Sequence, residues 1–172
     1  MRYNKTFFMK QLSNLYTTNE HLTGIILRIA LALVTFPHGC QLFLGWFGGF
    51  GFSGSMAYFT QMEKLPWIVG FAVILLQFFG ALFILFGFMG RFFAFAMTIL
   101  FIGMVATNHW QYGFFMNWMG DQKGEGFEFH LLAIGISIAI LASGSGSYSV
   151  DAMLSRKAKI KQPFFDHVNI YQ

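Results

Sequence analysis

The feature that most constrains the fold of this chain is an apolar stretch, residues 24–44, which reads GIILRIALALVTFPHGCQLFL. A helix rises about 1.5 Å per residue, so the stretch matches the ~30 Å thickness of a bilayer core. It predicts a membrane-spanning helix. Arg28 and His38 interrupt the stretch, and a cation at mid-membrane costs about 2.5–3.5 kcal/mol on insertion scales. We therefore expect these side chains to face protein or water, or to reach the membrane edge.

The composition excludes an ordinary soluble domain. Of 172 residues, 56% are hydrophobic and 10% are charged, whereas soluble proteins carry roughly 25% charged residues. The net charge of +4 does not indicate a nucleic-acid-binding face, because the basic residues gather at the two ends of the chain. Cys40 is the single cysteine, which excludes an intrachain disulfide and a CxxC redox pair.

Further apolar segments predict an all-α membrane protein, an antiparallel bundle of four transmembrane helices in one domain, residues 1–172. The segments after the first span are residues 67–89, 92–112 and 127–143. Residues 45–66, rich in glycine and aromatic side chains, are predicted to lie in the membrane interface. Residues 1–23 and 152–172 are predicted to be basic tails.

Basic residues beside the spans predict the orientation. Cytoplasmic segments of membrane proteins carry an excess of Lys and Arg. One side of the predicted bundle holds Arg2, Lys5, Lys10, Arg91, Arg156, Lys157, Lys159 and Lys161, and the other holds Lys64 and Lys123. Both termini are therefore expected in the cytoplasm, and the protein is expected in a bacterial inner membrane as a multi-pass protein.

Polar residues of several spans are predicted to meet at the extracytoplasmic end of the bundle, judged by their depth along each helix. A histidine and a carboxylate at low dielectric can hold and pass a proton, and walls of Phe and Met suit a flat ring with an isoprenoid tail. This pattern favours a quinone site. The predicted catalytic residues are His38, His109 and Glu128. The predicted cofactor-binding residues are Gln41, Gln77, Asn108 and Arg28.

Structural alternatives stay open for these residues. Gln77 also suits a hydrogen bond between helices, and Arg28 suits a cation that locks the bundle or extends to the membrane edge. In the last span the small residues Gly135, Ala139 and Ala142 align with Glu128. Glu128 is therefore predicted to face the bundle, with His130 on another side at the interface. Three histidines near one end also raise a metal or haem site, but no HxxxH or ExxH spacing occurs, and neither is expected.

Four pieces of the sequence, in this order, resemble the DoxX family of small four-span membrane proteins. The pieces are LRIALALVTFPHGCQLFLGWFGG, LLQFFGALFILFGFMGR, NHWQYGFF and GSGSYSVD, and the resemblance runs from Gly24 to Asp151. Arg28, His38, Gly39 and Gln41 fit the family's first-span pattern. The chain departs from many relatives at Gln77, where they have an acid, and at Leu42, where a lysine often follows the glutamine.

The resemblance implies a redox role. Family members are described as quinone-linked subunits of archaeal thiosulfate oxidation and as membrane anchors of oxidoreductase assemblies that respond to thiol and oxidative stress. Thiosulfate chemistry is not expected here, because only Lys64 and Lys123 offer positive charge on the outer side. The leading hypothesis is a quinone-linked oxidoreductase subunit. The alternative is a non-catalytic subunit or scaffold that docks a larger respiratory, secretion or redox complex. Passage of a small molecule is disfavoured, since mainly Thr35 is polar between Arg28 and His38.

Overall fold

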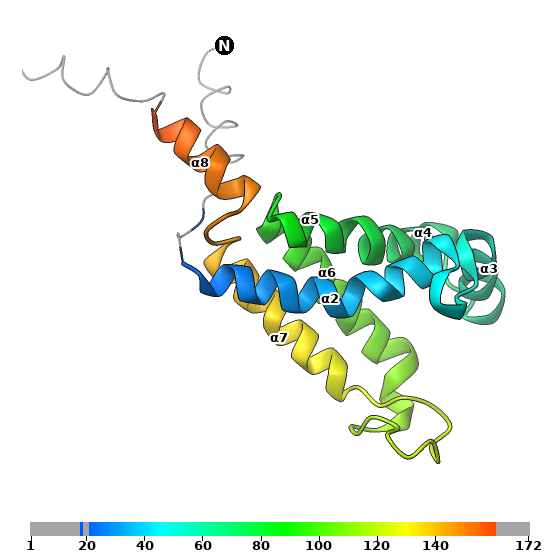
Figure 1. Ribbon diagram of the computed structural model, residues 1–172. Helices are drawn as coiled ribbons and strands as arrows, with labels where there is room; N and C mark the ends of the chain where they lie inside the picture. Colours follow the sequence, from blue (N-terminus) through cyan, green and yellow to red (C-terminus); the bar gives the residue numbers. More distant parts are fainter. Residues whose placement is uncertain (1–17, 19–20, 161–172) are drawn as a thin grey trace, which may run out of the picture.

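The computed structural model describes Thr18 and residues 21–160, and the regular elements in this part of the chain are all helical (Figure 1). Four long helical segments pack along one another, and shorter elements lie at their ends. In chain order the elements are α2 (Thr23–Leu44), η1 (Trp46–Gly48), α3 (Gly51–Ala57), η2 (Tyr58–Met62), α4 (Trp67–Leu75), η3 (Leu76–Gly80), α5 (Ala81–Phe86), α6 (Gly90–Met104), η4 (Val105–His109), η5 (Trp110–Tyr112), α7 (Glu128–Ser143) and α8 (Val150–Ile160).

Three segments are long and apolar enough to cross a membrane, and α7 is apolar but shorter. The three are Thr23–Leu44, Trp67–Phe86 and Gly90–Tyr112. The second ends at Phe86, whereas the sequence predicts a span that continues to Met89. The backbone explains the difference: Gly87 has a φ of 64° and Met89 a φ of 48°. Left-handed residues end a helix, and here they turn the chain back towards α6.

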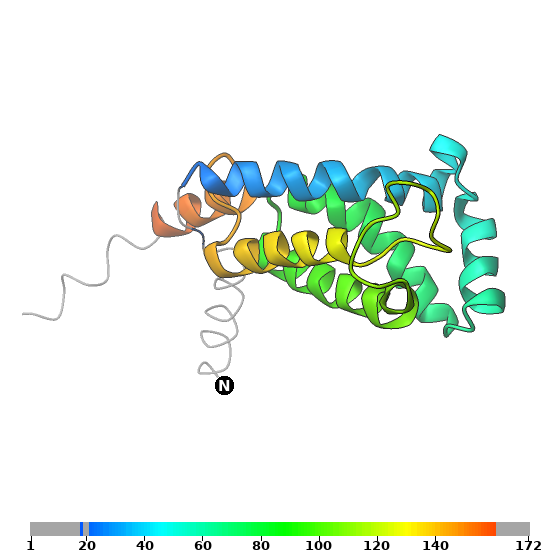
Figure 2. The same cartoon turned by 90° about the horizontal axis from the view of Figure 1, so that it is seen from below.

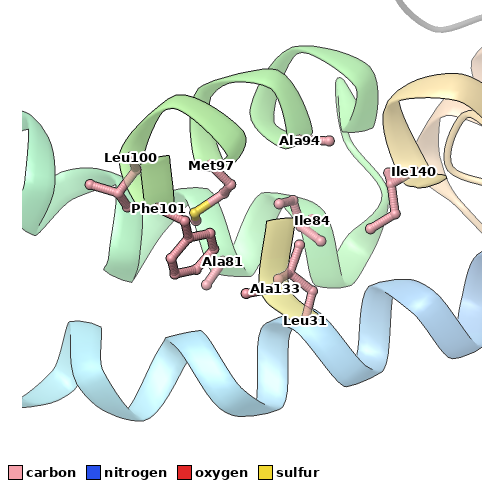
Figure 3. Close-up of a cluster of buried hydrophobic side chains, with 9 residues drawn as sticks. All are labelled: Leu31, Ala81, Ile84, Ala94, Met97, Leu100, Phe101, Ala133 and Ile140. Atoms are coloured by element: carbon pink, nitrogen blue, oxygen red, sulfur yellow. The ribbon is translucent and has the colours of Figure 1, made fainter. Parts of the chain in front are cut away.

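Side chains from four helices meet in one apolar core (Figure 3). Leu31 of α2, Ile84 of α5, Met97 of α6 and Ile140 of α7 are fully buried there. Lipid tails are as apolar as these side chains, so van der Waals packing, and not escape from water, holds such helices together. Close approach is therefore essential, and Gly39 provides it between α2 and η3. A Cβ on Gly39 would lie 2.4 Å from the carbonyl oxygen of Gln77.

The buried side of α7 differs from the predicted one. Ala139 is half-buried, Gly135 and Ala142 are exposed, and a Cβ on Gly135 would meet nothing within 4 Å. The residues that face the other helices are His130, Ala133, Ser137 and Ile140. The placement of His130 at the interface was therefore wrong. Apolar residues occupy every side of α7. Lipid accepts small and large apolar side chains equally, so the positions of the small residues did not show which side packs against the other helices.

Figure 2 shows the short elements at opposite ends of the long helices. The α3 helix crosses the end at which α2 finishes, and α8 lies at the end at which α2 begins. We call these the α3 end and the α8 end. The predicted interfacial segment corresponds to η1, α3 and η2 at the α3 end. The predicted tail over residues 1–23 lies largely outside the described residues, and the tail over 152–172 is described only as far as residue 160, where it continues α8.

Candidate functional site

A cavity of about 310 Å³ lies between the long helices towards the α3 end. Its lining combines three histidines with an apolar wall, and we call it the histidine cavity. The lining residues are Val34, Thr35, His38, Gln77, Phe101, Met104, His109, Met116, Glu125, Phe129 and His130. They come from α2, η3, α6, η4, α7 and the loop before α7. Ligand cavities of proteins typically have this character, apolar walls with a few converging polar groups.

Two of the histidines that line the cavity lie in ring-to-ring contact. The ring centroids of His109 and His130 lie 4.0 Å apart, with the planes tilted by 40°. The Nδ1 atom of His109 lies 2.8 Å from the backbone oxygen of Glu125. A carbonyl oxygen only accepts hydrogen bonds, so Nδ1 of His109 carries a proton and donates it. In the neutral ring, Nε2 is then the nitrogen with the lone pair.

Two residues that line this cavity carry a buried polar atom with no hydrogen-bond partner in the described part of the chain. The atoms are Nδ1 of His130, a residue only 5% exposed, and Oγ1 of Thr35, a residue 2% exposed. Several other helical hydroxyls donate to a backbone oxygen of the preceding turn, although Ser55 Oγ in α3 is also buried without a partner in the described residues. Thr98, for example, donates to the oxygen of Ala94 at 2.9 Å, and Ser137 donates to that of Ala133 at 2.8 Å. An unpaired buried polar group costs roughly 1–3 kcal/mol, so Thr35 and His130 destabilise the fold unless a partner reaches their polar atoms.

Irregular helix geometry brings polar residues to this cavity. Gln77 lies in η3 and His109 in η4, and both segments are π-helical turns within longer helices. Such turns are frequent at functional sites because they redirect side chains out of the regular ladder. In α2, Pro37 lies between Thr35 and His38. A proline removes one backbone donor from its helix, which frees a carbonyl one turn earlier.

Of the residues predicted for the site, His38, Gln77 and His109 line the histidine cavity together. Gln77 is buried at its inner wall, and His38 is exposed, as is the neighbouring lining residue Val34. The cavity therefore extends to the outer surface of α2. In a membrane this surface is the one that lipid covers.

Glu128, Gln41 and Asn108 do not line the cavity. The Glu128 carboxylate accepts a hydrogen bond from the backbone N–H of Met116 at 3.4 Å, which ties down the loop before α7. The Gln41 side chain donates to the backbone oxygen of Phe47 at 3.3 Å. Asn108, with its amide turned to suit both neighbours, donates to the carboxylate of Glu63 at 2.8 Å.

The lining residues that sequence reasoning missed are Thr35, Glu125 and His130. Thr35 stands one helical turn before His38, so helical spacing was a usable signal for it. His130 shares a side of α7 with Ala133 and Ser137, and that spacing also predicts a common face. Glu125 contributes through its backbone oxygen, for which a sequence carries no signal.

Arg28 is remote from this cavity and anchors the α8 end. Its guanidinium donates to the backbone oxygens of Leu85 at 2.7 Å, Ser147 at 3.0 Å and Tyr148 at 3.3 Å, while its Nε is buried without a partner. The contacts join α2 to α5 and to the connection that follows α7. They agree with the alternative of a cation that locks the bundle.

Asp151 completes the network at the α8 end. This fully buried carboxylate accepts hydrogen bonds from Met89 N at 2.8 Å, Gly90 N at 2.9 Å and Ser145 Oγ at 2.6 Å. Ser149 Oγ accepts from Ala152 N at 3.0 Å within the first turn of α8. The GSGSYSVD piece of the sequence therefore ties the turn between α5 and α6 to the start of α8.

Within residues 18 and 21–160, no three His, Cys, Asp or Glu side chains are grouped closely enough to hold a metal ion. A family model described as DoxX matches residues 24–110, which include Thr35, His38, Gln77 and His109. No curated protein and no solved structure matches the chain.

Proposed function

Because the chain belongs to the DoxX family, we propose that it is a quinone-linked subunit of a membrane oxidoreductase. The histidine cavity is the proposed quinone site. The observation that carries the proposal is that Thr35 and His130, each with a buried polar atom unpaired in the described residues, line one cavity with the other two histidines. Structural polar groups in a protein interior are almost always paired, so an unpaired couple at a cavity indicates a ligand.

The membrane placement is part of the proposal. We propose one integral membrane domain in which α2, the α4–η3–α5 segment, the α6–η4–η5 segment and α7 form an antiparallel bundle of four spans. The charge bias of the sequence supports cytoplasmic termini in a bacterial inner membrane. The α8 end then faces the cytoplasm. The histidine cavity lies towards the opposite side.

A quinone ring fits the chemistry of the lining. Its oxygens require hydrogen-bonding groups, which Thr35, Gln77 and His130 offer, and its faces require apolar walls such as Phe101 and Phe129. The cavity volume of about 310 Å³ is enough for a ring but not for a long tail. The exposed lining residues Val34 and His38 mark where an isoprenoid tail would pass to the lipid.

The chain's own residues supply proton handling. A bound quinone carries two electrons and two protons between its oxidised and reduced forms. The hydrogen bond to Glu125 fixes the His109 ring, which leaves Nε2 to accept a proton. A second positive charge on the closely spaced His109–His130 pair would be repelled by the first, so the pair is suited to passing one proton at a time.

The other predicted residues have supporting roles in this proposal. Glu128 holds the loop that carries Met116 and Glu125, and Gln41 and Asn108 hold the short elements at the α3 end. Arg28 keeps the far end of α2 in register. None of these four needs to contact the quinone.

Binding of a decyl-tailed ubiquinone analogue to the purified full chain in detergent micelles tests the proposal. We expect saturable binding that weakens at least tenfold in Thr35→Val and His130→Phe, since each good hydrogen bond contributes about 1.4 kcal/mol or more. The matched control is His21→Ala, which removes an exposed histidine at the α8 end and should leave binding unchanged. Equal binding by all four proteins, or none by the wild type, would refute the quinone site.

One observation favours the alternative, a non-catalytic subunit or scaffold. The loop before α7 exposes large apolar side chains: Trp118 is 83% exposed and Met119 is 87% exposed. Exposed apolar surface of this kind marks membrane or protein contacts. Stoichiometric co-purification with an oxidoreductase that is lost in Trp118→Ser but kept in His130→Phe would favour docking over quinone binding.

A further inference from the structure

A second hollow, of about 870 Å³, lies at the α8 end and does not share a lining residue with the histidine cavity. It runs between the start of α2, the end of α5 and the first turns of α8. We call it the α8 groove. The residues that matter here are Leu22, Phe86, Tyr148, Arg156 and Lys157.

One wall of the α8 groove is apolar and open. Leu22 is 66% exposed and Phe86 is 61% exposed, and each stands at the end of a helix apolar enough to span a membrane. At this position the side chains lie near the boundary between the hydrocarbon core and the headgroups, which is where spanning helices end. An acyl chain would find continuous apolar surface along this wall.

The opposite rim is cationic. Arg156 and Lys157 lie on the exposed side of α8, roughly one and a half turns beyond its buried start at Asp151 and Ala152. Tyr148, exposed beside them, adds a phenolic hydroxyl that can donate a hydrogen bond. No Asp or Glu is among the described residues that line the groove. The nearby carboxylate of Asp151 is buried and accepts its three hydrogen bonds from the protein.

We propose that the α8 groove binds one anionic phospholipid. The acyl chain lies on Leu22 and Phe86, and the phosphate lies at Arg156, Lys157 and the hydroxyl of Tyr148. A basic pocket at the ends of spanning helices has the chemistry that selects anionic headgroups. A free phosphate ion would leave the apolar wall unused, and a zwitterionic lipid would set its own ammonium against the cations. The inference does not rest on the quinone proposal, because it concerns the other end of the molecule.

The direct test is native mass spectrometry of the full chain in detergent micelles with equal amounts of phosphatidylglycerol and phosphatidylcholine of the same acyl chains. We expect one phosphatidylglycerol to be retained in preference to phosphatidylcholine. Each basic residue near a membrane surface contributes enough to change affinity about fivefold. Lys157→Gln should therefore lower phosphatidylglycerol retention about fivefold, and Arg156→Gln with Lys157→Gln should abolish the preference.

Four controls make the outcome decisive. Lys157→Arg keeps the charge and should keep the preference, while Lys123→Gln removes a cation from the loop before α7 and should change nothing. A Leu22→Ser variant should weaken retention without changing the response to charge. Glycerol 3-phosphate should not displace the lipid at matched concentration. Equal retention of both lipids, an unchanged Lys157→Gln variant, or displacement by glycerol 3-phosphate would overturn the proposal.

Discussion

At the α8 end, Asp151 accepts three hydrogen bonds from the turn between α5 and α6 and from Ser145, and Arg28 donates three to backbone oxygens. Towards the α3 end, Thr35 and His130 each bury a polar atom that has no partner. Both regions place polar side chains inside an apolar bundle. At the α8 end, protein groups pair with every described side-chain polar atom of Arg28 and Asp151 except Arg28 Nε.

The difference separates structure from function. A fully satisfied network makes its members rigid and fixes one arrangement of the helices. A network with unpaired polar groups lowers stability, so it is expected to persist mainly where those groups serve a function. Proteins depart from regular packing and hydrogen bonding chiefly at functional sites. We therefore assign the α8 network to folding and the histidine cavity to binding. Removing a polar group should lower the free energy of unfolding at the α8 end and raise it at the histidine cavity.

The largest expected effect is at the α8 end. Asp151→Ala leaves two backbone N–H groups and the Ser145 hydroxyl without an acceptor, and should lower the free energy of unfolding by about 3–5 kcal/mol. Equilibrium unfolding in mixed micelles of a mild detergent and SDS measures this. Asp121→Ala, in an exposed part of the loop before α7, is the matched control with little expected change. A stable Asp151→Ala protein would mean that the network does not hold the fold.

The histidine cavity should show the opposite sign. His130→Phe keeps an aromatic ring against Phe101 but removes the unpaired nitrogen, and should raise the free energy of unfolding by about 1–3 kcal/mol. Binding of the ubiquinone analogue should fall in the same variant. His109→Phe is the informative partner, because it deletes the hydrogen bond to Glu125 and should destabilise. Destabilisation by His130→Phe would show that its ring nitrogen is paired within the fold.

Thr35→Val tests the same removal of an unpaired polar atom with a smaller change of side-chain shape. Valine has nearly the shape of threonine and removes the unpaired Oγ1, so a gain of about 1 kcal/mol in unfolding free energy is expected. Thr98→Val deletes a hydroxyl that does bond to its own helix, and the same measurement should show no gain. Identical shifts in the two variants would remove the distinction between paired and unpaired hydroxyls.

The smallest expected effect lies in the exposed η2 segment. The Tyr58 hydroxyl donates to a Glu63 carboxylate oxygen at 2.6 Å, and this bond, with burial and the Glu63 charge adding to it, raises the pKa of Tyr58. Because the folded state favours the neutral phenol, its contribution is present below the unfolded pKa of about 10 and is lost as the pH rises through the folded pKa.

Tyr58→Phe should therefore cost less than about 1 kcal/mol at pH 8, since the bond is exposed to solvent. The difference from wild type should vanish as the pH rises well above about 10. Unfolding titrations of both proteins across this range make the comparison. A difference that grows with pH would contradict the assigned direction of the pKa shift.

Much of the fold could be predicted from the sequence, because bilayer thickness and apolar length determine a spanning helix almost alone. The DoxX resemblance is confirmed by the family match over residues 24–110. Three of the four predicted spans are long and apolar enough to cross a membrane, and the fourth, α7, is shorter. The site was predicted in part. His38, Gln77 and His109 do share a cavity. His130, predicted to lie on another side of α7, is buried against the other helices, whereas Glu128 is half-buried.

By itself the sequence determined that this is a helical membrane protein and which polar residues it carries into the bilayer. Only the tertiary structure decided which of them meet: His109 with His130, and Arg28 with backbone oxygens of residues 147 and 148. The physical reason is that lipid and protein interiors are both apolar, so composition does not set how a helix is rotated about its axis. Close packing of particular side chains sets that rotation, and with it the position of every polar group.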